Sequence, residues 1–350
     1  MPAVLLAYLS PARVEVPGAW TSISIAPWVT LHHLSRVAGY LLVFLLVREI
    51  LCRFRRQPWL VVLPLIVIGA AEACVGILQH AAGGLEGRVR GTYANRNHFA
   101  GLLEMVLPFA LLYAVSLIPR ARSSMRLALR AGLLMSVAAV IFLGIVYSLS
   151  RMGFTAVFCS LFVMGLLAAS SRLRPWKGLL VVGLLAIAML LGFVFLAPDA
   201  LIDRFAELRS TQEIAAEGRL SLWRATLDLI RASPFFGWGL GAYESALLQR
   251  RSSLPDVPDV YAHNDYLQLL AELGVSGVLP LGILLIAVVS IAYRAALQDR
   301  DSDSWLLALA CVGALAAILI HSSTDFNLYI PANAMLLAWI AGVCVGLRTS

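Results

Sequence analysis

The chain has 350 residues, of which 60% are hydrophobic and only 13% charged, and its mean hydropathy is +0.85. A soluble domain carries about 25% charged residues, so this composition excludes a soluble enzyme with a single apolar anchor. The formal charge of +7 comes almost entirely from arginine, because Lys177 is the only lysine. No soluble module presents a basic face, which excludes nucleic acid as a partner.

Apolar runs long enough to cross a bilayer recur along the chain. A transmembrane helix needs about 20 apolar residues, and a lipid-embedded backbone must satisfy its hydrogen bonds within the segment, so each run is predicted to be helical. Nine runs are found, at 29–51, 59–78, 99–118, 131–149, 154–170, 178–197, 266–293, 305–323 and 328–347. The sequence therefore predicts an all-α, polytopic integral membrane protein with one membrane domain over residues 1–350. Met1–Leu9 resembles the tail of a further helix, which indicates N-terminal truncation.

Clusters of basic residues occupy every second connection between these runs. They stand at 53–56, 120–130, 172–177 and 294–300, and Arg348 lies at the end of the chain. The positive-inside rule places these connections in the cytoplasm. The connections between them then face outward, toward the periplasm if the membrane is a bacterial inner membrane.

The stretch 198–265 is the one long hydrophilic segment and is predicted to be a large periplasmic loop. It contains a predicted amphipathic helix from Arg219 to Ala232 that would lie on the membrane surface. Its predicted apolar face consists of Leu220, Trp223, Leu227 and Ile230. Ser233-Pro234 is predicted to end this helix, and the glycines of Gly237–Gly241 to form a tight turn behind it.

Three outward arginines are candidates for binding an anion. Arg151 lies in a very short outer turn, where the positive-inside rule disfavours it; Arg219 begins the surface helix, and Arg96 follows a polar stretch. A guanidinium group stays charged and can bind two phosphate oxygens at once through parallel hydrogen bonds. These residues therefore suit the pyrophosphate of a polyprenyl-linked sugar. The alternative is that they extend to lipid headgroups.

His263 is the best candidate for a general base, because a histidine of near-neutral pKa can take a proton from an acceptor hydroxyl. The alternative is an ordinary interfacial histidine. We expect it to precede the first turn of the next helix, with Asn264 or Asp265 as N-cap. Deeper in that helix Glu272 is expected to face a cavity or a partner, and a functional and a structural role both remain open.

Two further pairings are predicted among the polar residues of the spans. His321 and Asp325 form a second possible acid–base pair around the last outer turn. Glu72 and Glu104 lie within spans, and one of them could pair with an arginine of the outer site. No acidic motif of the kind that binds divalent metals is found.

Several motifs together resemble the O-antigen ligase and polymerase superfamily of bacterial membrane glycosyltransferases. They are Gly91–Ala100, Ser150–Gly153, Gly218–Arg219 with Trp223, Pro234–Gly241 and His263–Gly274. Their order and their outward placement make the match specific, over roughly residues 60–345. Family members commonly have more N-terminal spans than this chain.

The resemblance implies a GT-C-type helical membrane fold and an inverting transfer that needs neither a metal nor another cofactor. The donor would be an undecaprenyl-pyrophosphate-linked glycan. His263 would match the family's essential histidine, and Arg151 and Arg219 its pyrophosphate-binding arginines. The other candidate substrate-binding residues of these motifs are Arg96, Asn97, Asn264 and Glu272.

The acceptor is left open by the sequence, because the acceptor surface lies in variable loops. A ligase would act on lipid A core in lipopolysaccharide synthesis, a polymerase on a growing polysaccharide such as an exopolysaccharide, and a third group acts on protein. A transporter of lipid-linked glycans is the alternative of another class, but it would place polar groups near the bilayer midplane. Here the motifs concentrate at the outer edge. A purely structural membrane subunit would not need outward arginines beside a histidine.

Overall fold

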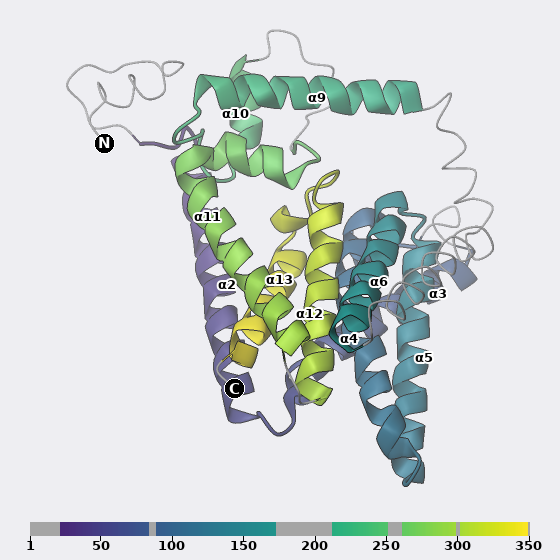
Figure 1. Cartoon of the computed structure of the whole chain (residues 1–350). Helices are drawn as coiled ribbons and strands as arrows, with labels where there is room; N and C mark the ends of the chain where they lie inside the picture. The colour runs from purple at the N-terminus through teal and green to yellow at the C-terminus, as the bar shows by residue number, and fades with distance from the viewer. Residues whose placement is uncertain (1–21, 84–88, 173–211, 251–260, 299–301, 349–350) are drawn as a thin grey trace. The chain divides into compact units, whose positions relative to one another are not determined.

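The structure is a computed structural model that describes residues 22–83, 89–172, 212–250, 261–298 and 302–348 (Figure 1). Within these ranges every regular element is a helix and no strand occurs. The elements are α2 (Pro27–Arg53), η1 (Pro58–Val61), α3 (Leu63–Ala81), α4 (Arg96–Ala121), α5 (Met125–Tyr147), α6 (Arg151–Arg172), α9 (Gln212–Ala232), α10 (Tyr243–Arg250), α11 (Asp265–Gln298), α12 (Ser302–His321), η4 (Asn327–Tyr329) and α13 (Pro331–Arg348). The all-α prediction is confirmed for these residues.

Six of the described helices are long and apolar enough to cross a membrane, namely α3, α4, α5, α6, α11 and α12. They coincide with six of the nine predicted runs. The run 29–51 forms α2, and the run 328–347 forms η4 and α13. Neither α2 nor α13 is among the six helices that meet the criteria for a span. The run 178–197 lies outside the described residues. The chain is a multi-pass membrane protein, while nine spans and the GT-C type stay predictions.

The chain divides into two compact units. The loop unit comprises Met1–Leu41, Glu207–Ile286 and Ser322–Tyr329, and the bundle unit comprises Leu42–Ala206, Ala287–His321 and Ile330–Ser350. The predicted outer segment 198–265 supplies α9 and α10 of the loop unit, and its residues 198–211 and 251–260 lie outside the described ranges.

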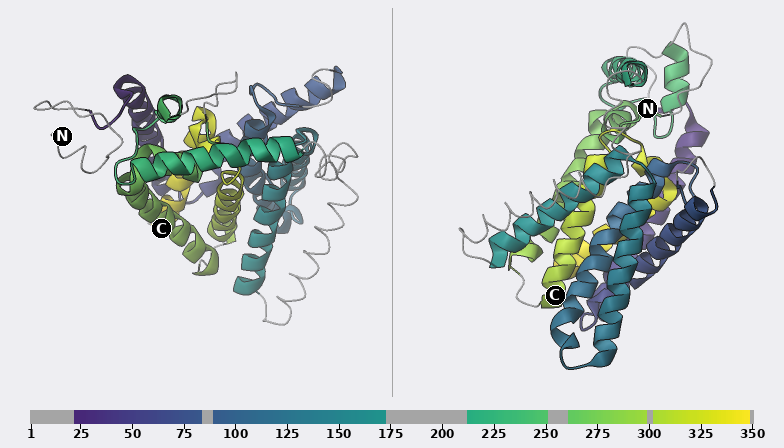
Figure 2. Two further views of the ribbon diagram at one scale, coloured as in Figure 1. Left: turned by 90° about the horizontal axis from the view of Figure 1, so that it is seen from above. Right: turned by 90° about the vertical axis from the view of Figure 1, so that its right-hand side faces the viewer.

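The bundle unit is built around α4, which packs against α5, α6 and α12 (Figures 1 and 2). Its most buried side chains include Phe99, Leu103 and Phe109, each 0% exposed. Between helices in lipid, van der Waals packing replaces the hydrophobic effect, so close approach matters most. Gly153 of α6 shows this, because a Cβ added there would lie 2.6 Å from the Cβ of Ala100.

An ion pair joins the end of α4 to the beginning of α12 in the bundle unit. The Arg120 guanidinium lies 3.0 Å from the Asp303 carboxylate. Each charge also suits its helix terminus, since cations stabilise C-terminal ends and anions N-terminal ends. The pair brings together two connections that the sequence assigns to the same side of the membrane.

The α9 helix packs within the loop unit on a different face from the predicted one. Its buried stripe is Leu222, Thr226 and Leu229, whereas Leu220 and Leu227 are 46% and 39% exposed. The stripe is fixed by polar contacts, because the Thr226 hydroxyl lies 2.7 Å from the Tyr243 hydroxyl of α10. The predicted apolar face is thus divided, since Ile230 packs against this core while Leu220 and Leu227 are exposed, and its placement on the membrane surface stays a prediction. Hydrophobicity alone did not identify the buried threonine and its tertiary partner.

Candidate active site

His263 lies immediately before α11, as predicted. Asn264 caps the helix, since its side-chain oxygen accepts from the Leu267 amide at 3.1 Å and its amide nitrogen donates to the Ser323 carbonyl at 2.9 Å. His263 itself has a φ of 49°, a left-handed conformation that non-glycine residues rarely adopt. Strained backbone of this kind clusters at functional sites, where the surrounding structure over-determines it.

A buried carboxylate stands behind the His263 ring. Its Nδ1 lies 3.5 Å from Oδ1 of Asp325, whose side chain is 1% exposed while that of His263 is 35% exposed. Phe326 packs its ring edge-on against the imidazole, with 4.9 Å between centroids. His263 Nδ1 forms no hydrogen bond in this structure, but a histidine that is open on one side and faces a buried carboxylate on the other is placed as a general base would be.

Asp325 and Glu104 each lie beside a histidine. Asp325 lies beside His263, not in the predicted pair with His321. His321 Nδ1 instead lies 3.0 Å from Glu104 in the bundle unit, where both side chains are 0% exposed. Glu72 accepts hydrogen bonds from the amide and hydroxyl of Thr92, at 3.0 and 2.6 Å. The sequence placed His321 and Asp325 one helical turn apart, but α12 ends at His321.

Glu272 is fully buried in the loop unit. As expected for a carboxylate inside an apolar helix, its side chain has hydrogen-bond partners. Its oxygens accept from the Gly241 amide at 2.5 Å, the Tyr329 hydroxyl at 2.8 Å and the Gln268 side-chain amide at 3.2 Å. Asp265 lies on the same helix face, where its carboxylate accepts from the amide of residue 328 at 3.1 Å. Three donors on one carboxylate indicate that Glu272 holds the surrounding segments together.

The glycine-rich turn 233–241 docks into a break in α11 at Gly274, where φ is 61°. In a regular helix the amides of residues 275 and 276 would donate to the carbonyls of 271 and 272. Four bonds to the turn are made instead: Trp238 N to Ala271 O (3.0 Å), Gly239 N to Glu272 O (2.8 Å), Val275 N to Pro234 O (2.9 Å) and Ser276 N to Phe235 O (3.0 Å). A Cβ at Gly237 or Gly274 would collide with the facing backbone, so both positions require glycine.

Aromatic residues that the sequence analysis did not single out surround His263. The rings of Tyr261 and Phe326 stack at 4.1 Å, and those of Tyr261 and Tyr329 are 5.8 Å apart. Burial, followed by the nearby Glu272 charge, raises the pKa of Tyr329 well above its ordinary value. Tyr329 therefore stays protonated and donates its hydrogen bond to Glu272.

Arg219 lies on α9 in the same unit as His263 and is exposed. It is one helical turn before Trp223, so the two share a helix face. The Trp223 indole donates to the carbonyl of Ala262 at 3.0 Å, next to His263 in the chain. This face of α9 thus adjoins the segment that positions the histidine.

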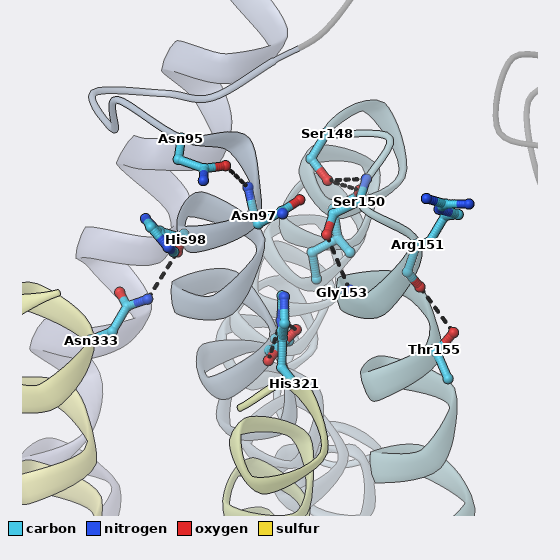
Figure 3. A network of polar contacts seen from close by, with 12 residues as sticks. Asn95, Asn97, His98, Ser148, Ser150, Arg151, Gly153, Thr155, His321 and Asn333 are labelled. Atoms are coloured by element: carbon cyan, nitrogen blue, oxygen red, sulfur yellow. Dashed lines mark hydrogen bonds and ion pairs between the residues drawn. The ribbon is translucent and has the colours of Figure 1, made fainter. Parts of the chain in front are cut away.

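Arg96 and Asn97 begin α4 in the bundle unit, and both are half-buried; Figure 3 shows Asn97 beside Asn95 and His98. Asn95 is the N-cap, with its side-chain oxygen accepting from the Asn97 amide at 2.9 Å. The carbonyl of His98 accepts from the Asn333 side chain at 3.0 Å, which ties this end of α4 to α13.

Arg151 is the first residue of α6, and Ser150 caps that helix by accepting from the Gly153 amide at 3.2 Å (Figure 3). Because Gly153 lies against Ala100, the beginnings of α4 and α6 meet. Arg96 and Arg151 therefore stand at two adjacent helix N-termini. The positive end of the helix dipole favours anions at such positions.

The candidate residues are divided between the two units. Arg219, His263, Asn264 and Glu272 lie in the loop unit, and Arg96, Asn97 and Arg151 lie in the bundle unit. The described ranges contain no group of three or more histidine, cysteine, aspartate or glutamate side chains that could hold a metal ion. Independence from metal stays a prediction.

Residues 134–282 match the protein-family model described as O-Antigen ligase. The resemblance to the O-antigen ligase and polymerase superfamily is confirmed over this segment. The matched residues run from α5 to the first half of α11 and include Arg151, Arg219, His263 and Glu272. The comparison with curated proteins gives no match. The segment that matches the O-Antigen ligase model thus contains the histidine, its helix cap and two of the candidate arginines.

Proposed function

We propose that the protein is an inverting membrane glycosyltransferase that moves a glycan from undecaprenyl pyrophosphate to an acceptor hydroxyl at the periplasmic face of a bacterial inner membrane. The observation that supports this most directly is His263, half-exposed before α11 and backed by the buried carboxylate of Asp325, within the O-antigen ligase segment. The helical, multi-pass architecture fits a lipid-linked substrate.

In the proposed reaction His263 removes the proton of the acceptor hydroxyl as its oxygen attacks C1 of the donor sugar. The bond between C1 and the pyrophosphate oxygen breaks from the opposite face, so the configuration at C1 is inverted. Asp325 holds the imidazole in orientation and stabilises the imidazolium that forms. Undecaprenyl pyrophosphate is a good leaving group, so the mechanism requires no general acid.

The arginines would bind the pyrophosphate, whose negative charge grows as the bond to C1 breaks. Arg151 and Arg219 are the principal residues in this proposal, with Arg96 and Asn97 beside Arg151 at the adjoining helix N-terminus. Fixed cations and oriented amides of this kind stabilise developing charge in the transition state. Asn264 and Glu272 position His263 and the glycine-rich turn.

The subclasses of this superfamily differ in their acceptor. A ligase would use lipid A core, a polymerase would use a growing polysaccharide, and a third group would use protein. The test uses the full chain in membranes with an undecaprenyl-pyrophosphate oligosaccharide, a panel of these acceptors and no added metal, and it measures release of undecaprenyl pyrophosphate. We expect turnover by the parent that His263→Ala and Arg219→Ala both lose. The acceptor that supports turnover names the subclass.

Matched controls make the test specific. Arg231, exposed on α9 and paired with Asp228, is the control for Arg219, and His80, which stacks on Tyr147 in the bundle unit, is the control for His263. Arg231→Ala and His80→Ala should retain turnover at equal protein levels. Donor binding without turnover on every acceptor would favour transport, and absence of donor binding would refute the lipid-linked donor.

A further inference from the structure

The first half of α2 presents polar side chains on its one packed face. Thr30, His33, Arg36 and Tyr40 are half-buried, whereas the other residues of the stretch 31–39 are exposed. Their spacing of three to four residues places them on one side of the helix. An arginine that only extended to lipid headgroups would lie among the exposed residues. Arg36 instead lies on the face that packs inside the loop unit.

This face of α2 packs against the segments that hold the His263 site. The Thr30 hydroxyl donates to the Leu240 carbonyl at 2.9 Å, and the His33 ring lies 6.2 Å from the Tyr329 ring. His33 also contacts Gly241 so closely that a Cβ there would collide with the imidazole. Arg36 is one turn further along the same face of α2.

The Arg36 guanidinium lies within electrostatic range of the Tyr261 phenol. Burial raises the pKa of that phenol, and the Arg36 charge opposes the rise. Tyr261 in turn stacks on Phe326, which contacts the His263 ring. The charge of Arg36 thus acts on the aromatic cluster that surrounds the candidate base.

Among the residues that the structure describes, no carboxylate forms an ion pair with the Arg36 guanidinium within 4.0 Å. Glu244, which also acts on the Tyr261 phenol, is only half-buried, and the two buried acids of the site already have partners. Glu272 accepts from three donors, and Asp325 faces His263. A partly desolvated guanidinium has a strong preference for a carboxylate or phosphate that binds it bidentately.

We propose that Arg36 binds an anionic group of a substrate at the His263 site, as a further substrate-binding residue. The inference extends the proposed glycosyl transfer. The group is a phosphate or a carboxylate, and it has two possible sources: the pyrophosphate of the donor, or an acidic group of the acceptor next to the attacking hydroxyl.

Steady-state kinetics of the full chain in lipid nanodiscs test the proposal, using a neutral acceptor glycan and its acidic counterpart. Loss of a charged hydrogen-bonding group predicts that Arg36→Gln raises one KM by about 10- to 100-fold while kcat changes much less. A rise in donor KM with both acceptors assigns the anion to the pyrophosphate. A rise in acceptor KM confined to the acidic glycan assigns it to the acceptor. Arg36→Lys should recover only part of the loss, because lysine cannot bind bidentately.

Arg53 is the matched control, since it lies at the other end of α2, exposed and paired with Glu49. Arg53→Gln should leave both KM values unchanged, and equal KM values for Arg36→Gln and the parent would overturn the proposal. If the parent shows no turnover with any substrate, the transferase has failed, and binding of inorganic pyrophosphate then tests Arg36 directly. Weaker pyrophosphate binding by Arg36→Gln than by the parent supports the anion site. Equal binding by the two proteins, or no binding by the parent, overturns it.

Discussion

At the scale of single residues, the pair of His263 and Asp325 carries the chemistry that we propose. The histidine is reachable from outside the protein, but its carboxylate is not. A base arranged in this way depends on the buried partner to orient its ring and to stabilise its charged form. The carboxylate should therefore affect the rate of the reaction far more than it affects donor binding.

We expect Asp325→Asn to lower kcat by about 10²- to 10⁴-fold, the range over which a positioned general base contributes. Donor binding should change little, because the arginines and helix N-termini are intact. The measurement is release of undecaprenyl pyrophosphate at equal protein level. Asp303→Asn, at the partly exposed pair with Arg120, serves as the control and should retain parental kcat. A similar loss in both variants would show that Asp325 acts through stability alone.

Tyr329 should matter mainly for stability. Tyr329→Phe removes one of the three donors to the buried Glu272 carboxylate, which predicts a loss of about 1–3 kcal/mol in the free energy of unfolding. Thermal unfolding in detergent measures it. Tyr113, whose ring stacks on Trp59 at 4.9 Å, offers a comparison, since Tyr113→Phe preserves the stacking ring. An unchanged unfolding temperature for Tyr329→Phe would mean that Glu272 does not need the hydroxyl.

At the scale of elements, the break in α11 shows how one helix and one turn depend on each other. Gly274 allows the break, and the turn 233–241 occupies it with four backbone bonds. The sequence indicated the turn from its glycines. It did not indicate the break, because an isolated glycine in an apolar helix is common and signals a break only when another backbone docks there.

Substitution at two glycines of α11 should separate these roles. Gly274→Ala puts a Cβ against the Phe235 carbonyl and forces a strained φ, so we expect a marked loss of stability and of turnover. A Cβ at Gly282 meets nothing within 4 Å. Gly282→Ala should therefore be neutral or stabilising by up to about 1 kcal/mol. The measurement is the thermal unfolding of both variants. Equal unfolding temperatures for Gly274→Ala and Gly282→Ala would argue against a docked turn.

Sequence reasoning succeeded for elements that periodicity defines and failed where a tertiary partner decides. Six of the predicted spans, the cap at Asn264 and the place of His263 follow from local patterns. The buried face of α9 depends on Thr226 and its partner Tyr243, which no local pattern contains. Arg36 was not singled out, because an arginine near the beginning of an apolar run resembles an ordinary interfacial residue until its packed face is known.

At the scale of the whole molecule, the alternation of basic connections predicts the orientation of every span. The α4 helix has 26 residues, or about 39 Å at 1.5 Å per residue, enough to cross a hydrocarbon core of about 30 Å. Ala94 and Ser123, both exposed, lie just beyond its two ends. They are suited to labelling from opposite sides.

In a background lacking the five native cysteines, we expect Ala94→Cys to react with a membrane-impermeant maleimide in cells whose inner membrane is intact. Ser123→Cys should react only after that membrane is permeabilised. The reverse pattern would invert the predicted topology and place the motif-bearing end in the cytoplasm. Labelling of both before permeabilisation would mean that α4 does not span.

The docking of the turn into α11 also has a consequence for how the protein is made. The turn is synthesised before α11, and a newly inserted α11 can keep its amides satisfied only as an unbroken helix. Docking later exchanges two hydrogen bonds within the helix for four between turn and helix. We therefore expect the break to form only when the turn docks, after membrane insertion, and a chain arrested before docking to contain a straight α11.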